Sequence, residues 1–172
     1  MLIYTPYQGK KSRAATKDRY PVIYVLDGEN NFRSVAITVE RLADMGLCPP
    51  MIVVGIHTRD RWGEFVPVES NGDTAKGADR LAEYLRDEVI PLIDSLYRTK
   101  KFRVAGGHSL GSTFVIHEMT KDNSLFQTGI TASPNLTVNN EQIVRDARNY
   151  FLRDPKNSRF FYVLAGTAGN TE

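Results

Sequence analysis

The sequence predicts an α/β fold, a doubly wound and mostly parallel sheet with helices on both faces. Apolar, β-branched runs alternate along the chain with segments in which apolar residues recur at helical spacing. Two of the runs, Val22–Leu26 and Met51–Ile56, are unbroken, as is typical of strands buried on both faces. The length of 172 residues suits one domain, so we expect residues 1–172 to form a single domain.

The first part of the chain predicts two strands, a helix and a third strand. Leu2–Thr5 is a candidate strand, and the polar segment 7–19 is a loop before the Val22–Leu26 strand. Asn30 or Asn31 is a candidate N-cap for a helix that runs to about Met45. The Met51–Ile56 strand follows, and segment 57–76, rich in charge, glycine and proline, is predicted to be a long loop.

The remaining elements continue the alternation. Segment 77–97 is predicted to be helical because Leu81, Leu85 and Val89 share one face, and Pro91 should kink or break it. Beyond it, the pattern predicts strands and helices in turn: strand 102–105, helix 112–121, strand 128–132, helix 141–152 and strand 159–165. The last strand is strongly apolar.

Composition excludes several classes of protein. Twenty-two basic and 20 acidic side chains give a net charge of +2, and the absence of a basic stripe argues against nucleic acid as a partner. No apolar run approaches a membrane span, and no signal peptide is visible, which makes a cytoplasmic location the default without excluding a periplasmic or secreted one. Cys48 is alone, so no intrachain disulfide can form. We expect no cofactor and no metal.

The motif Gly107-His108-Ser109-Leu110-Gly111 carries the most functional information. It reads G-x-S-x-G, between a predicted strand and a predicted helix, which is the context of the nucleophile elbow in α/β-hydrolases. A sharp turn of this kind holds the serine in a strained conformation at a helix N-terminus, where free N–H groups can bind an oxyanion. Small flanking residues let the backbones approach each other.

Several stretches together resemble the esterase D / enterochelin esterase family of α/β-hydrolases. The resemblance runs from about residue 2 to residue 166, in the family's order. It is carried by these segments: Tyr20-Pro-Val-Ile-Tyr-Val-Leu-Asp-Gly28, Ile52-Val-Val-Gly-Ile56 with Arg59-Asp-Arg61, Gly77-Ala-Asp-Arg80, Glu88-Val-Ile-Pro-Leu-Ile-Asp94, Tyr97-Arg-Thr99, Ala105-Gly-Gly-His-Ser-Leu-Gly111 and Ser133-Pro134.

The resemblance implies a serine hydrolase that acts on small-molecule carboxylic esters or thioesters through an acyl-enzyme. Ser109 would be the nucleophile, and the backbone N–H of Leu110 would be one oxyanion-hole donor. The second donor would be the N–H of Glu29, after the Asp27-Gly28 pair. The side chain of Asp27 is itself a candidate carboxylate for the pocket, although an aspartate at a strand end more often orders its turn.

The general base and the acid do not follow the family's pattern. The triad order is serine, acid, histidine, yet no histidine follows position 117. His57 and His108 are candidates for the pocket, and His117 lies about 12 Å along the helix from Ser109 and should be structural. Glu172, the last residue, is the candidate acid because it is the only carboxylate after the final strand.

Three functions therefore stay open on the sequence. The chain is a serine esterase, an acyltransferase that shares the same motifs, or a non-catalytic protein of this fold that lacks a complete triad. The family's pattern continues beyond this chain, so we expect the fold to be incomplete at its C-terminal end. The apolar strand 159–165 would then form an uncovered edge, and we expect the isolated chain to self-associate. The acyl and alcohol specificities do not follow from these residues.

Overall fold

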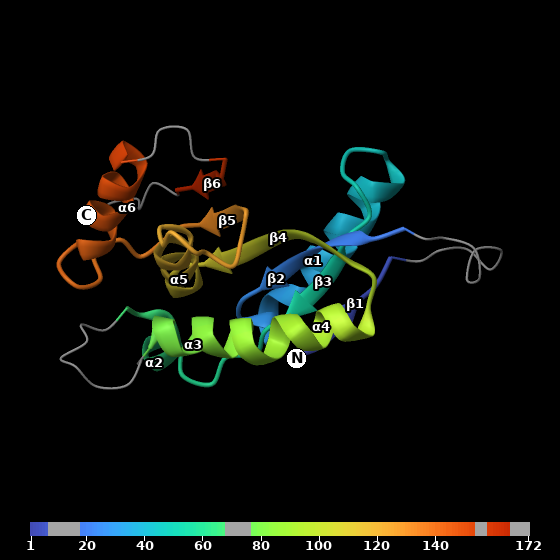
Figure 1. The fold of residues 1–172 in the computed structure, drawn as a ribbon, viewed down its shortest axis with the longest axis horizontal. Coiled ribbons are helices and arrows are strands. Elements are labelled where there is room, and N and C mark those ends of the chain that lie inside the picture. The colour runs from blue at the N-terminus through green and yellow to red at the C-terminus, as the bar shows by residue number, and fades with distance from the viewer. Residues whose placement is uncertain (7–17, 68–76, 154–157, 166–172) are drawn as a thin grey trace, which may run out of the picture.

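A mostly parallel sheet organises the computed structural model, which describes residues 1–6, 18–67, 77–153 and 158–165. Its strand order is β1-β3-β2-β4-β5-β6, and only β1 is antiparallel to its neighbour (Figure 1). The predicted α/β architecture is confirmed. The strands are β1 (Leu2–Tyr4), β2 (Tyr20–Val25), β3 (Ile52–Gly55), β4 (Thr99–His108), β5 (Thr128–Ala132) and β6 (Phe160–Leu164).

Helices cover both faces of the sheet. The helix α1 (Gly28–Asp44) packs on one face, against a core that includes Val25, Val53 and Val104. The opposite face has the larger core, to which the helices between residues 61 and 119 contribute. The helices that follow α1 are α2 (Arg61–Phe65), α3 (Ala78–Tyr84), the π-helical turn η1 (Leu85–Val89), α4 (Ile90–Leu96), α5 (Leu110–Met119) and α6 (Gln142–Arg153).

Several predicted bounds were wrong near the motif. The strand predicted at 102–105 is β4, which spans Thr99–His108 because it pairs with β2 on one side and β5 on the other. The helix predicted to start at residue 112 starts at Leu110, directly after Ser109. The predicted loop 57–76 contains α2, since Asp60 caps a short helix there by accepting a hydrogen bond from the Gly63 N–H.

The expected irregularity before Pro91 takes the form of a wider helical turn. The N–H of Ile90 bonds to the carbonyl of Leu85, five residues earlier, rather than to residue 86. Proline has no N–H and its ring needs room on the preceding turn, so a π-helical turn accommodates it without ending the helix. Segment α3-η1-α4 therefore runs as one interrupted helix across the sheet (Figure 1).

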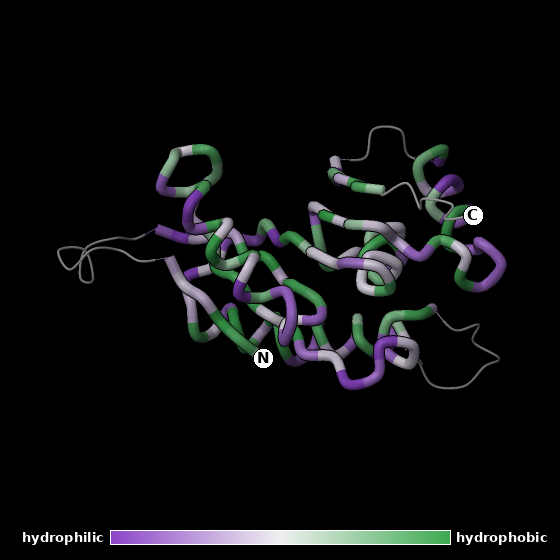
Figure 2. The backbone as a smooth tube through the Cα atoms, turned by 180° about the vertical axis from the view of Figure 1, so that it is seen from behind, coloured by the Kyte–Doolittle hydropathy of each residue, from purple (hydrophilic) through white to green (hydrophobic). Residues whose placement is uncertain are grey.

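The last two strands expose an apolar face. Ile130 of β5 pairs with Tyr162 of β6, and their side chains are 43% and 53% exposed. Leu164 and Phe160, two residues to either side of Tyr162, share its face and are also exposed. Figure 2 shows β6 as mostly hydrophobic although it lies at the edge of the sheet that the described residues form.

Gly28 tests how closely α1 approaches the sheet. A Cβ atom at this position would lie 2.6 Å from the carbonyl carbon of Gly55, which is backbone and cannot move aside. We expect Gly28→Ala to lower the free energy of unfolding by about 1–3 kcal/mol, as overpacked sites do. Chemical denaturation measures the effect.

Gly106→Ala is the matched control for this substitution. Its added Cβ would meet Ile23 and the Tyr24 carbonyl only at 3.9 Å, an ordinary contact. We expect that variant to stay within about 0.5 kcal/mol of the unchanged protein. Equal stability of the two variants would contradict the close approach of α1 to β3.

Candidate active site

Ser109 occupies a strained turn between β4 and α5. Its backbone has φ 55° and ψ −119°, a region that residues other than glycine rarely adopt, at a cost of about 1–3 kcal/mol. The turn is held by hydrogen bonds from the Ser109 N–H to the Ala132 carbonyl (2.9 Å) and from the Thr113 N–H to the Ser109 carbonyl (3.2 Å). The Ser109 hydroxyl has no hydrogen-bond partner among the described residues, so it is free to meet a ligand.

Gly107 makes the turn sterically feasible. A Cβ there would lie 2.5 Å from the backbone of Gly111, so any larger residue would force the elbow open. A Cβ at Gly111 would meet its neighbours at 3.4 Å or more, which is less restrictive. The expectation that small residues flank the serine for steric reasons thus holds most strongly for Gly107.

Ser112 ties the elbow to the neighbouring strand. Its hydroxyl is fully buried and lies 2.7 Å from the Gly107 carbonyl and 3.0 Å from both the carbonyl and the N–H of Ala132. It can donate to one carbonyl at a time while it accepts from the N–H. This side chain therefore fixes the start of α5 against the end of β5.

Several backbone N–H groups next to this turn lack acceptors among the described residues, and two of them are the oxyanion-hole donors predicted from the sequence. One belongs to Leu110, the first residue of α5, and the other to Glu29 in the first turn of α1. The carbonyl that would serve each within a continuing helix is already used: Gly106 accepts from Leu26, and Val25 accepts from Ile56. Both amides lie at helix N-termini, which favour negative charge.

The turn between β2 and α1 is built around Asp27. Its backbone is left-handed (φ 50°), and its carbonyl accepts hydrogen bonds from the N–H groups of Asn30 and Asn31. Its buried carboxylate does not cap the helix; it binds Arg61, with Nε 2.9 Å from Oδ1 and Nη2 3.2 Å from Oδ2. The same Nη2 donates to the His108 carbonyl at 3.2 Å. Asp27 thus lies beside the site with its charge already paired.

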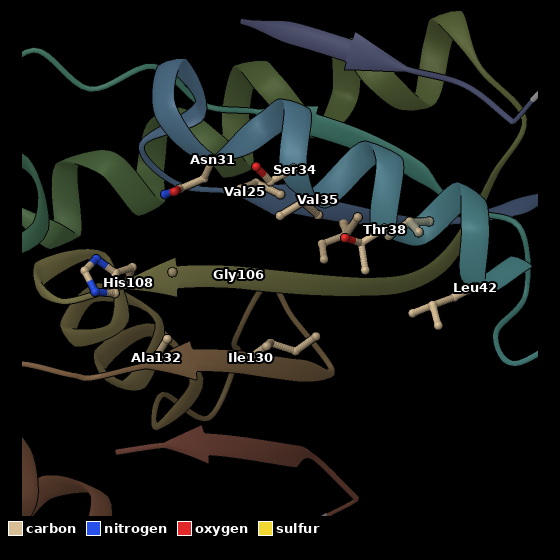
Figure 3. A pocket seen from close by; sticks show the side chains of 13 residues that line it. Val25, Asn31, Ser34, Val35, Thr38, Leu42, Gly106, His108, Ile130 and Ala132 are labelled. Atoms are coloured by element: carbon tan, nitrogen blue, oxygen red, sulfur yellow. The ribbon is translucent and has the colours of Figure 1, made fainter. Parts of the chain in front are cut away.

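The His108 ring faces the other side of the sheet, beneath α1. It lines an apolar groove of about 400 Å³ between α1 and the strands β4 and β5. Figure 3 shows Asn31, Ser34 and Thr38 of α1 opposite His108 and Ile130. Gly106, Gly107 and Ala132 line the same groove. The His108 ring forms no hydrogen bond with Ser109.

The other two histidines lie apart from Ser109. His57 is exposed just after β3, and β2 lies between β3 and β4, so about 10 Å of sheet separates the two strand ends. His117 is structural, as expected: its Nε2 lies 3.0 Å from Asp79 Oδ1. Burial opposes ionisation of Asp79, but hydrogen bonds from Lys121 and His117 outweigh it and hold the pKa of Asp79 below its usual value. Glu172 lies outside the described residues.

Sequence reasoning missed the roles of α2 and Ser112. Arg61 entered only as part of a family-like segment, yet it contacts both turns of the site. The signal that indicates α2 is Asp60, a favoured N-cap residue type, with the acidic Glu64 in the first turn; Glu64 accepts from the N–H groups of Arg59 and Asp60. No sequence pattern marks Ser112, because its partner Ala132 lies 20 residues away on β5.

The described residues hold no cluster of three histidine, cysteine, aspartate or glutamate side chains that could bind a metal ion. No helix within the same ranges is both long and apolar enough to cross a lipid bilayer.

The parallel sheet, the strained serine between strand and helix, and the free amides beside it define an α/β-hydrolase fold. The chain belongs to the family described as "Putative esterase", whose model matches residues 2–159.

Named relatives agree with this assignment. The chain is 26% identical over 191 residues to the ferri-bacillibactin esterase BesA of Bacillus subtilis, covering 98% of this chain and 66% of that protein. It therefore spans just under two thirds of the length of that relative.

Solved structures share the fold. The BES protein from Bacillus cereus has a TM-score of 0.78 at 24% identity, over 96% of this chain and 69% of that one. The IroE-like serine hydrolase from Shewanella oneidensis has a TM-score of 0.79 at 24% identity, over 94% of this chain and 54% of that one.

Ser112→Ala tests the link between the elbow and β5. The substitution leaves the part-buried Ala132 N–H without its acceptor, so we expect a loss of about 1–3 kcal/mol in the free energy of unfolding. Ser95→Ala on α4 is the control, because its exposed hydroxyl contacts only the Leu92 carbonyl, and it should cost less than about 0.5 kcal/mol. Denaturant titration compares the two, and a Ser112→Ala variant as stable as Ser95→Ala would argue against the link.

Proposed function

We propose that this protein hydrolyses carboxylic esters through a covalent acyl-enzyme on Ser109. The observation that carries the proposal is the strained Ser109 turn, which presents an unbonded hydroxyl next to the free N–H groups of Leu110 and Glu29. A nucleophile and two oxyanion donors at adjoining strand ends are what acyl transfer requires.

The reaction follows from this arrangement in two steps. Ser109 Oγ attacks the ester carbonyl and loses its proton to a general base, while the carbonyl oxygen becomes an anion bound by the Leu110 and Glu29 amides. Collapse of this intermediate expels the alcohol and leaves an ester of Ser109, which water then cleaves to release the acid. Glu172, as proposed from the sequence, would orient the base, and its position lies outside the described residues.

The relatives suggest which esters to test. BesA is described as an esterase of ferri-bacillibactin, and two Aspergillus nidulans proteins of this fold as siderophore hydrolases. We therefore propose that catecholate or other siderophore esters belong to the substrate class, next to simple carboxylic esters and thioesters. An acyltransferase uses the same first step, so added alcohol acceptors should be included in the assay.

Covalent labelling tests the nucleophile. We expect a fluorophosphonate to modify Ser109, with the label located by mass spectrometry, and we expect Ser109→Ala to abolish labelling. In p-nitrophenyl ester hydrolysis, Ser109→Ala should lower kcat/KM by about 10³-fold or more, as loss of a serine nucleophile does. Ser95→Ala should match the unchanged protein.

The outcomes separate the remaining alternatives. A label on another residue, or full activity of Ser109→Ala, would refute the nucleophile assignment. A folded protein that neither labels nor turns over esters would be a non-catalytic binding protein. Turnover that His57→Ala abolishes would identify His57 as the base, and transfer of the acyl group to an alcohol would identify an acyltransferase.

We further propose that the 172-residue chain self-associates through the exposed β5–β6 face. The exposed apolar side chains on this face are Ile130 of β5 and Tyr162, Leu164 and Phe160 of β6. Because β6 is also the edge strand of the described sheet, its backbone groups can pair with another chain. Sedimentation at micromolar concentration should show dimers or larger species, and Tyr162→Thr with Leu164→Thr should shift them toward monomer. Leu47→Thr, at a still more exposed residue elsewhere, is the control. A monomeric unchanged chain would contradict the proposal.

A further inference from the structure

We propose that Arg61 is a positioning residue that fixes the two turns of the oxyanion hole relative to each other. The inference rests on the proposed esterase function and deepens it. The guanidinium of Arg61 binds the Asp27 carboxylate in the turn that precedes Glu29, and it donates to the carbonyl of His108, which precedes Ser109. One rigid group therefore spans the two segments that carry the proposed donors.

Among the described residues, one other hydrogen bond joins the segments that lead into these turns. Below them, the Leu26 N–H bonds to the Gly106 carbonyl at 2.9 Å, which continues the β2–β4 ladder. Beyond that bond, Gly111 of α5 faces Asp27 and Leu26 without a hydrogen bond: a Cβ placed on Gly111 would lie 3.4 Å from the Asp27 carboxylate and from Leu26. The Glu29 and Leu110 amides both lie past the hydrogen bond between Leu26 and Gly106. The distance between these two amides therefore depends on the bridge through Arg61.

Arg61 is well suited to this task because its own helix is held firmly. The Asp60 carboxylate caps α2 through the Gly63 N–H, and Glu64 accepts from the N–H groups of Arg59 and Asp60. At the other end of α2, Phe65 is fully buried and packs against Phe114 of α5. The guanidinium lies 6.0 Å from the Phe65 ring centre, which limits its movement further.

Both contacts match the chemistry of a planar guanidinium. Its fork binds the two Asp27 oxygens in parallel and still has an N–H for the His108 carbonyl, which an ammonium on a flexible stem cannot reproduce. Asp27 is buried and its left-handed backbone sets the start of α1, so movement of its carboxylate would move the Glu29 amide with it. Without the Arg61 bridge, the distance between the Glu29 and Leu110 amides would fluctuate more widely.

Steady-state kinetics of Arg61→Leu test the inference. Misplacing one oxyanion donor without removing it should lower kcat for a p-nitrophenyl ester by about 10–100-fold, somewhat less than the loss of a donor. The KM should change less than about threefold, because the bridge acts on the transition state rather than on substrate binding. The rate of Ser109 labelling by a fluorophosphonate should fall in parallel.

Two further variants complete the design. Arg61→Lys keeps the charge beside Asp27, so it should fold even if Arg61→Leu does not, and we expect it to lose at least about fivefold in kcat. Arg59→Leu is the matched control, since Arg59 lies two residues away and contacts Glu64 only through its backbone N–H. It should keep the kcat of the unchanged protein.

The results separate the inference from the function on which it rests. Unchanged kcat in folded Arg61→Leu, or in Arg61→Lys if the leucine variant is unfolded, would overturn the positioning role while Ser109→Ala still abolishes activity. A rise in KM alone would assign Arg61 to substrate binding and would also overturn it. Full activity in Ser109→Ala would instead refute the proposed function.

Discussion

The pairing of β2 with β4 is the constraint on which the rest of the site depends. The two strands are parallel and in register from Val22 opposite Arg103 to Val25 opposite Gly106, so they end at the same edge of the sheet. Parallel strands place their carboxyl ends side by side, and each is followed here by a helix N-terminus. This pairing brings the Asp27 turn to the Ser109 turn, although 82 residues separate them in sequence.

Strain and close packing are concentrated at this edge. Asp27 and Ser109 both have positive φ, and Gly28 and Gly107 lie where a Cβ would collide with backbone. Such conformations persist only where surrounding contacts determine them. Ser112 supplies those contacts from the β5 side, and Arg61 supplies them from α2, so the site is fixed by elements on both flanks.

The two faces of the sheet contribute differently to function. On the face opposite α1, buried side chains of β2, β3 and α5 anchor α2 and hence Arg61. On the face beneath α1, the His108 ring lines an apolar groove that extends to the exposed Ile130 of β5. The Ser109 turn is therefore held by Arg61 and Ser112, whereas the adjacent His108 ring lies in the groove beneath α1.

The sequence by itself determined the α/β class, the order of the strands along the chain and the nucleophile motif. These depend on local signals: unbroken β-branched runs such as Val22–Leu26, helical periodicity in 77–97, and Gly-x-Ser-x-Gly after a strand. An irregularity of the helix at Pro91 was also predictable, because proline lacks an N–H wherever it occurs; its form, a π-helical turn, was not.

Only the tertiary structure decided which distant residues meet at the motif. The ion pair of Arg61 with Asp27, the contact of Ser112 with Ala132 and the distance of His57 from the elbow all depend on strand order, which local patterns do not encode. The helix α2 was missed because five residues carry too little periodicity to be distinguished from a polar loop. Packing against Phe114 stabilises it, and that contact exists only in the folded chain.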